Sequence, residues 1–217
     1  MTLRASVIIT SHNEGASIRA TLLGLAQDRA FREGWAEVVL VDDRSTDDTV
    51  AQALSVDLPA LRLLRAAPDS ASPLTTRQQA LDLGFRAAAS PIILTLDGDG
   101  QNPPEEWPKL AAPVLADKPG RIGLVAGQRV GRQDTWSKKI ASRLANRLRG
   151  WILQDGTRDT GCGLKGFRRD AFLTLPFFNH MHRYLPALFA RDGWRVAHVD
   201  VSHRPRGAGA SNYSNLQ

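Results

Sequence analysis

The chain has 217 residues, with 28 Lys or Arg against 22 Asp or Glu, and so carries a formal net charge of +6. A single cysteine, Cys162, excludes an intrachain disulfide and a cysteine-based zinc site. The positive charge favours anionic partners, namely nucleotides, lipid phosphates, anionic membranes or nucleic acids. No apolar stretch approaches the roughly 20 residues that span a bilayer, so neither a membrane-spanning segment nor a secretory leader is expected.

Strands and helices are expected to alternate along the chain. Short aliphatic runs predict strands at residues 5–9, 36–41, 61–64, 92–96 and 122–126. The segments that follow predict helices at residues 16–27, 47–54, 76–89 and 104–115. Later strands at 163–168 and 194–201 are expected on either side of a helix at 182–191. This order is typical of βαβ units, and it predicts a single α/β domain over residues 1–217 with a largely parallel sheet.

Polar side chains follow the first two expected strands. Residues 11–14 read Ser-His-Asn-Glu after the first strand, and Asp42 and Asp43 follow the second. Just beyond these acids, Ser45 or Thr46 is expected to cap the next helix. Because ligands of α/β proteins gather beyond the carboxyl ends of the strands, these polar groups are candidates for a binding site.

The strand end at residues 92–101 is the most informative segment, and it reads Ile-Ile-Leu-Thr-Leu-Asp-Gly-Asp-Gly-Gln. If the backbone stays extended, Asp97 and Asp99 point the same way, and the glycines allow close approach to a ligand. Two carboxylates and the amide oxygen of Gln101 suit Mg²⁺ or Mn²⁺ bridging a diphosphate. The alternative is a polar turn with surface acids, because Asp-Gly pairs are common in turns. Helix capping alone explains neither Asp-Asp nor Asp-Gly-Asp.

In this order and spacing, the segments resemble the nucleotide-sugar half of the family 2 glycosyltransferases, which are inverting enzymes with a GT-A fold. Residues 97–99 match the family's Asp-x-Asp motif. Within the family the chain most resembles the polyprenyl-phosphate transferases of the dolichol-phosphate mannosyltransferase type. This narrower resemblance rests on residues 97–101 with Pro103 and Pro104 following, and on residues 127–132, 159–168 and 206–213.

The resemblance covers nearly the whole chain and implies a three-layer, Rossmann-like GT-A sandwich. The nucleotide-sugar half would span about residues 1–127, and the acceptor half about residues 128–217. Asp42 and Asp43 match acids that bind the base and the ribose, and Glu14 matches a contact to the base.

The same resemblance assigns the metal site. Asp99 is expected to ligate Mg²⁺ or Mn²⁺ with support from Gln101, while Asp97 holds the ribose or a water of the metal. The cation would stabilise the departing nucleoside diphosphate. The other donor-site residues implied are Thr10, His12, Arg77, Arg206 and Ser211.

The chain departs from the family pattern near the base. The family usually has proline and tyrosine where Thr10 and His12 stand, and glycine where Thr76 stands. For His12 and Arg77, the alternative is that both are ordinary surface residues at helix starts.

Arginines mark the acceptor half. A phosphate acceptor is largely dianionic at neutral pH and needs cations that orient it, whereas a hydroxyl acceptor needs a general base. The planar fork of arginine suits phosphate better than lysine does. Arg129, Arg132 and Arg143 are the candidates, and the resemblance favours Arg129 and Arg143. Asp159 matches the base that the family uses with hydroxyl acceptors; here it either acts so or orients the arginines or the sugar.

Two further segments belong to the acceptor half. Residues 135–153 predict a basic amphipathic helix, which lies on a membrane surface or packs its apolar stripe on the sheet. The glycine-rich loop at 204–213 is expected to close over the diphosphate with Arg206 and Ser211; a flexible tail is the alternative. Since many members of the family continue into membrane helices, a C-terminal membrane segment is expected to be missing here.

Three hypotheses follow. The first is metal-dependent, inverting sugar transfer from a GDP- or UDP-linked donor to undecaprenyl or dolichyl phosphate, at the cytoplasmic face of a membrane. The second is transfer to a hydroxyl of a glycan or other acceptor, with Asp159 as base. The third is a basic nucleic-acid-binding domain. Only the net charge supports it, because no basic stripe interleaved with aromatics is present, and no nucleic-acid partner is expected.

Overall fold

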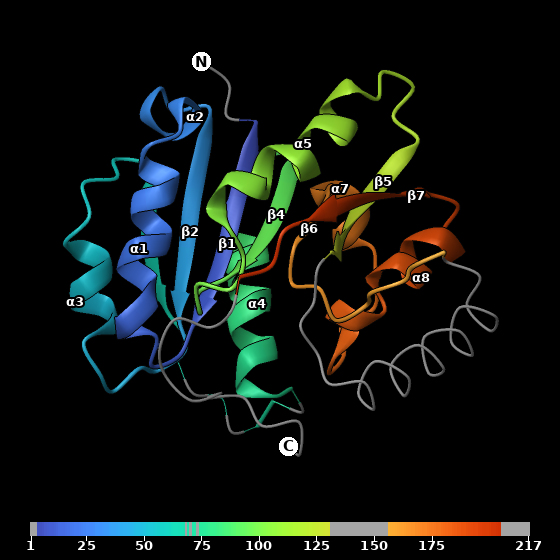
Figure 1. Ribbon diagram of the computed structural model, residues 1–217. Coiled ribbons are helices and arrows are strands. Elements are labelled where there is room, and N and C mark those ends of the chain that lie inside the picture. The colour runs from blue at the N-terminus through green and yellow to red at the C-terminus, as the bar shows by residue number, and fades with distance from the viewer. Residues whose placement is uncertain (1–3, 68, 70, 73, 131–155, 205–217) are drawn as a thin grey trace.

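The computed structural model describes residues 4–67, 69, 71–72, 74–130 and 156–204. Within them, seven strands form one sheet in the order β3-β2-β1-β4-β6-β5-β7 (Figure 1). The strands are β1 (Ala5–Ser11), β2 (Ala36–Asp42), β3 (Leu61–Arg65), β4 (Ile92–Asp97), β5 (Ile122–Arg129), β6 (Lys165–Arg168) and β7 (Arg195–Val201). The α-helices are α1 (Gly15–Ala26), α2 (Arg29–Arg32), α3 (Thr49–Leu54), α4 (Thr76–Ala87), α5 (Trp107–Ala116), α7 (Arg169–Leu173) and α8 (Leu185–Arg191). Two short 3₁₀ helices complete the elements, η1 (Pro104–Glu106) and η2 (Met181–Arg183).

The sheet is largely parallel, as the order of elements predicts. Strand β1 pairs in parallel with β2 and β4, β2 with β3, and β5 with β7. Only β6 runs against its neighbours β4 and β5 among the described strands. Its reversed direction brings its first residue, Lys165, opposite Thr95 and Ala126, near the ends of the two flanking strands.

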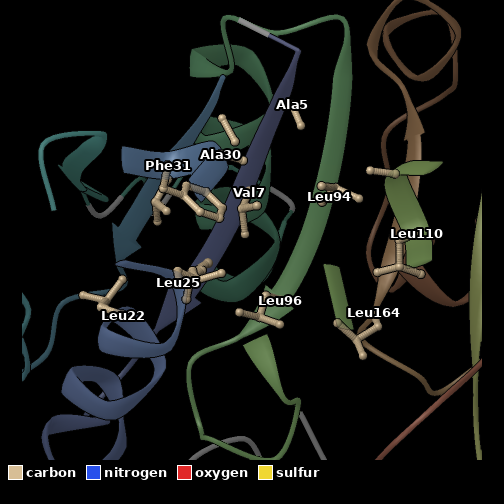
Figure 2. Close-up of a cluster of buried hydrophobic side chains, with 14 of the residues drawn as sticks. Ala5, Val7, Leu22, Leu25, Ala30, Phe31, Leu94, Leu96, Leu110 and Leu164 are labelled. Atoms are coloured by element: carbon tan, nitrogen blue, oxygen red, sulfur yellow. The ribbon is translucent and has the colours of Figure 1, made fainter. Parts of the chain in front are cut away.

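One face of the sheet is covered by α1, α2, α3 and α5. Val7 of β1 packs there with Leu22 of α1, Phe31 of α2, Leu94 of β4 and Leu110 of α5 (Figure 2). Successive side chains of a strand point to opposite faces, so every second residue of β1 and β4 joins this cluster. The buried residues of α1, Ile18, Leu22 and Leu25, therefore pack against this face of the sheet.

The other face is covered by α4, α7 and α8. Ile8, the neighbour of Val7 in sequence, packs there with Phe85 of α4, Phe167 of β6 and Phe189 of α8. Helices on both faces make three layers, which confirms the predicted sandwich. No helix in the described ranges is both long and apolar enough to cross a bilayer.

Most predicted elements are confirmed to within a few residues, and the differences have local causes. The helix expected at 104–115 is divided into η1 and α5. Pro108 lacks an amide hydrogen and cannot donate to the carbonyl of Pro104, so the single continuous helix was wrong. The short helices α2 and α7 were not expected, because four or five residues carry too little periodicity to be recognised.

Phe167 tests the packing of the second face. Its ring centroid lies 5.6 Å from that of Phe85, 5.1 Å from Phe172 and 6.0 Å from Phe189. Phe167→Ala should lower the free energy of unfolding by about 3–5 kcal/mol, because it removes a fully buried ring and leaves a cavity. Urea denaturation measures this, with Phe178→Ala as the control, since Phe178 is 37% exposed. Equal losses in the two variants would contradict the packing described here.

Candidate active site

The registers of β1, β2 and β4 bring three strand ends to one level. Ser11 of β1 pairs with Asp42 of β2, and Thr10 pairs with Asp97 of β4. The polar residues that follow these strands therefore meet along one edge of the sheet, as the sequence predicts. Thr10 itself is only 7% exposed, so its side chain is buried beneath the polar residues of this edge.

The loops after β1 and β2 are joined through Asn13, which adopts a left-handed conformation with φ of 53°. Its amide donates to Ser45 Oγ at 2.9 Å, and its Oδ1 accepts from the amide of Thr46 at 2.8 Å. The prediction that Ser45 or Thr46 caps the next helix was wrong. These two groups are instead bonded to a loop more than 30 residues earlier in the chain.

Asp47 fastens the starts of α1 and α3 together. Its Oδ2 accepts from the amide of Gly15 at 3.1 Å, and its Oδ1 accepts from the amide of Thr49 at 3.0 Å. Although burial raises the pKa of Asp47, the hydrogen bonds from Thr49 and Gly15 bring it below its ordinary value. Glu14, the predicted base contact, is held in turn, because its amide donates to Thr49 Oγ1 at 2.8 Å.

Asp42 and Asp43 are buried at the end of β2, with exposures of 3% and 1%. Asp43 Oδ1 accepts from Nη2 and Nε of Arg44 at 2.8 and 3.0 Å, and Asp42 Oδ1 accepts from the amide of Ser45 at 3.3 Å. His12 Nδ1 lies 2.6 Å from the carbonyl oxygen of Asp43. A carbonyl oxygen only accepts, so Nδ1 carries the proton in this arrangement. The structure thus brings His12 against the acidic pair, and its role with a ligand stays a prediction.

Asp97, the last residue of β4, accepts hydrogen bonds on both carboxylate oxygens. Arg77 Nη2, from the first turn of α4, lies 3.1 Å from Oδ1, and Asn102 Nδ2 lies 3.0 Å from Oδ2. The ion pair shows that Arg77 faces the site rather than standing at an unrelated helix start. Asn102 is 2% exposed and was missed by the sequence reasoning, whose only signal was an amide directly after Gln101.

Asp99 and Gln101 lie in a turn, because the extended backbone ends at Asp97. Asp99 Oδ1 accepts from the amide of Gln101 at 3.1 Å, and Gly100 has φ of +75°. The condition under which the two acids would point the same way, an extended backbone, is therefore not met, because the chain turns within the motif. The carbonyl oxygen of Gln101 also accepts from the amide of Arg204 at 2.9 Å, which joins this turn to the segment after β7.

The donor set at this turn is compatible with a divalent cation. Asp97, Asp99 and Gln101 supply carboxylate and amide oxygens, the ligands that Mg²⁺ and Mn²⁺ prefer. In the part of the chain that the structure describes, no three residues among His, Cys, Asp and Glu gather as a complete metal centre. A cation here therefore needs further oxygens, such as those of a diphosphate or of water.

Arg129 and Asp159 form a two-bonded ion pair at the end of β5. Arg129 Nε lies 2.6 Å from Asp159 Oδ2, and Nη2 lies 2.8 Å from Oδ1. The two side chains are 15% and 13% exposed. Although burial lowers the pKa of Arg129, the hydrogen bonds and charge of Asp159 raise it above its ordinary value.

Gln128 holds this pair in place. Its side chain is buried, and its Oε1 accepts from the amides of Arg158 and Asp159 at 2.9 and 3.0 Å. Gln128 falls within the segment 127–132 that carries the family resemblance, but that resemblance assigns its side chain no function. The other predicted acceptor residues, Arg132 and Arg143, lie outside the described residues, as do the helix at 135–153, Arg206, Ser211 and the loop beyond residue 204.

His182, in η2, has an unusual electrostatic environment. Burial, together with the positive charges of Arg77 and Lys165, lowers the pKa of His182 to about 3 from 6.5. The unfolded chain therefore takes up this proton first as the pH falls. The resulting loss of stability is absent above pH 6.5 and accumulates between pH 6.5 and 3.

His182→Gln should flatten the pH dependence of unfolding by about one proton over this range. Urea denaturation at a series of pH values measures the slope. His180→Gln is the control, because His180 is exposed and only two residues away. Identical slopes for wild type and His182→Gln would contradict the environment assigned to His182.

Known proteins resemble this chain in both sequence and fold. Residues 6–175 match the family described as Glycosyl transferase family 2. Undecaprenyl-phosphate 4-deoxy-4-formamido-L-arabinose transferases from Sodalis glossinidius and an Enterobacter species are 31% and 30% identical to it, each over 99% of this chain. The chain spans 64% of the length of these relatives.

Solved structures of glucosyl-3-phosphoglycerate synthase from Mycobacterium tuberculosis share the fold. The complex with Mn²⁺, UDP and glucosyl-3-phosphoglycerate has a TM-score of 0.72 at 22% identity, over 94% of this chain and 73% of the other. The complex with Mg²⁺ and UDP has a TM-score of 0.71 at 23% identity, over 94% and 72%. With the family match over most of its length and the GT-A architecture of these neighbours, the chain belongs to glycosyl transferase family 2.

Proposed function

We propose that this chain transfers a sugar from a nucleoside-diphosphate sugar to a polyprenyl phosphate, with inversion and with the aid of a divalent cation. The reaction would take place at the cytoplasmic face of a membrane, which residues 135–153 would contact. The observation that carries the proposal is the Arg129–Asp159 ion pair, which lies at the same edge of the sheet as the donor-side acids.

The geometry of this pair favours a phosphate acceptor over a hydroxyl. A general base must bring a carboxylate oxygen within hydrogen-bond reach of the hydroxyl proton, and a carboxylate paired with an arginine is a weaker base than an unpaired one. Both oxygens of Asp159 accept from Nε and Nη2 of Arg129. Among the described residues, the hydrogen bonds of the Arg129 guanidinium are those from Nε and Nη2 to Asp159, and Nη1 takes no part in them. Asp159 would then orient Arg129 so that it binds phosphate oxygens.

The donor side supports a nucleoside-diphosphate sugar. The buried acids Asp42 and Asp43, together with Glu14 from the loop after β1, would accept hydrogen bonds from base and ribose. Asp97, Asp99 and Gln101 would hold Mg²⁺ or Mn²⁺, which supplies positive charge to the departing diphosphate. The M. tuberculosis neighbours were crystallised with UDP and these same cations.

The chemistry then requires little from the protein beyond placement. A phosphate oxygen of the acceptor attacks the anomeric carbon of the sugar from the face opposite the diphosphate, and the bond to the diphosphate breaks. Because the attacking oxygen already carries negative charge, no proton has to be removed. Arg129 would hold that oxygen in line, and Asp97 would hold the donor. The names of the curated relatives support undecaprenyl phosphate as the acceptor.

The direct experiment uses the full-length protein in a bilayer mimic. Labelled nucleotide sugars are incubated with Mn²⁺ and with undecaprenyl or dolichyl phosphate, and the lipid product is extracted into butanol. A labelled lipid identifies donor and acceptor together. Labelled product that stays in the aqueous phase, with a glycan or phosphoglycerate acceptor, would favour transfer to a hydroxyl instead.

Variants of the ion pair separate the two roles of Asp159. If Asp159 orients Arg129, Asp159→Asn and Arg129→Lys should both raise the KM for the lipid phosphate, by roughly tenfold or more, because the fork geometry is lost. If Asp159 is a base, Asp159→Asn alone should lower kcat by about 10²–10⁴-fold at unchanged KM. Arg158→Lys is the control, because Arg158 pairs with Asp200 at the surface, where its side chain is 71% exposed.

A further inference from the structure

Lys165 is a buried basic residue that belongs neither to the Asp-x-Asp motif at residues 97–99 nor to the proposed chemistry. It is 3% exposed, and it is the only lysine or arginine buried among the described residues. In the sheet it lies opposite Thr95 of β4 and Ala126 of β5. Residues paired across a ladder point to the same face, as do residues two apart on a strand. Lys165 therefore shares its face with Asp97 on one side and Gln128 on the other.

The ammonium group of Lys165 is bonded to the backbone rather than to a carboxylate. Nζ donates to the carbonyl oxygen of Cys162. Burial lowers the pKa of Lys165, with smaller opposing effects from Cys162, Asp97 and Asp159. Burying an amine in this way costs stability. A core position that needed only volume would be filled better by an apolar side chain, so the amine has a purpose other than packing.

The carbonyl that Lys165 holds belongs to a short segment, residues 161–164, which we call the bridging segment. At one end, a Cβ on Gly161 would lie 3.2 Å from Arg129 Nη2. Next to Cys162, a Cβ on Gly163 would lie 2.0 Å from Asp97 Oδ2, which leaves no space for a side chain. The bridging segment is thus in contact with the donor carboxylate and with the acceptor ion pair at once.

The bridging segment is also fixed on both sides by the sheet. Thr95 Oγ1 of β4 donates to the carbonyl oxygen of Gly163, and the amide of Gly127 of β5 donates to that of Leu164 at 2.9 Å. The carbonyl oxygen of Cys162, the residue before Gly163, is held by Lys165. Removal of the amine would leave this buried oxygen without its donor, and the segment would shift to regain one.

We propose that Lys165 is a positioning residue, which sets the spacing between Asp97 and the Arg129–Asp159 pair by holding the bridging segment. The inference rests on the proposed function, in which Asp97 belongs to the donor site and Arg129 to the acceptor site. In-line attack needs the reacting atoms about 3–3.5 Å apart, and a misplacement of about 1 Å can cost 10²-fold in rate. Lys165 would therefore affect turnover more than the binding of either substrate.

The test compares Lys165→Met with Lys165→Gln in the full-length protein in a bilayer mimic. Methionine keeps the length of the side chain but removes the donor, whereas glutamine keeps an N–H donor without the charge. Lys165→Met should fold, bind the donor sugar within about threefold of wild type, and lose about 10- to 100-fold in kcat at little-changed KM. Lys165→Gln should recover part of that loss. Lys109→Met is the matched control, because Lys109 is 53% exposed on α5 and should keep its kcat.

Three measurements decide the outcome, namely thermal unfolding, calorimetry of donor binding and kcat. Thermal unfolding and calorimetry of donor binding show whether each variant is folded and competent to bind. An unchanged kcat in Lys165→Met, or losses of donor affinity and kcat in equal proportion in both variants, would overturn the inference. A wild-type protein without transfer to lipid phosphate would instead refute the proposed function. The inference would then fall with it, because it rests on Arg129 holding the acceptor.

Discussion

The parallel register of β1, β2 and β4 is the constraint on which the site depends. Because Thr10 is paired with Asp97 and Ser11 with Asp42, side chains distant in sequence come to one edge at the same height. The loops that follow are then tied to one another through Asn13 and Asp47. A slip of one residue in any of these pairings would turn each carboxylate to the opposite face of the sheet.

The reversed strand β6 brings a segment of the chain to the same edge of the sheet on the acceptor side. Since it begins where β4 and β5 end, the segment that leads into it passes between Asp97 and Arg129. Glycines at 161 and 163 permit that passage, because a Cβ at either position would crowd a charged group of the site. Lys165, the first residue of β6, is buried with its amine directed to the carbonyl oxygen of Cys162 in that segment.

Much of the fold and of the edge that carries the site can be predicted from the sequence, because both follow from local patterns. Aliphatic runs ending in acids identify β2 and β4 and the edge where they finish. The partners of those acids cannot be predicted in this way. Asn102 holds Asp97, and Gln128 holds the backbone of Asp159, through contacts that exist only once the chain has folded. The predicted helix cap failed for the same reason, since Ser45 bonds to Asn13 from another loop.

In the proposed reaction, a divalent cation at Asp97, Asp99 and Gln101 would join the protein to the diphosphate of the donor. Isothermal calorimetry of UDP- and GDP-sugars, with and without Mn²⁺, tests it most directly. We expect that binding requires Mn²⁺ and weakens at least about tenfold in Asp99→Asn, because a carboxylate ligand is lost. Binding that is equally tight without Mn²⁺, or in Asp99→Asn, would contradict it.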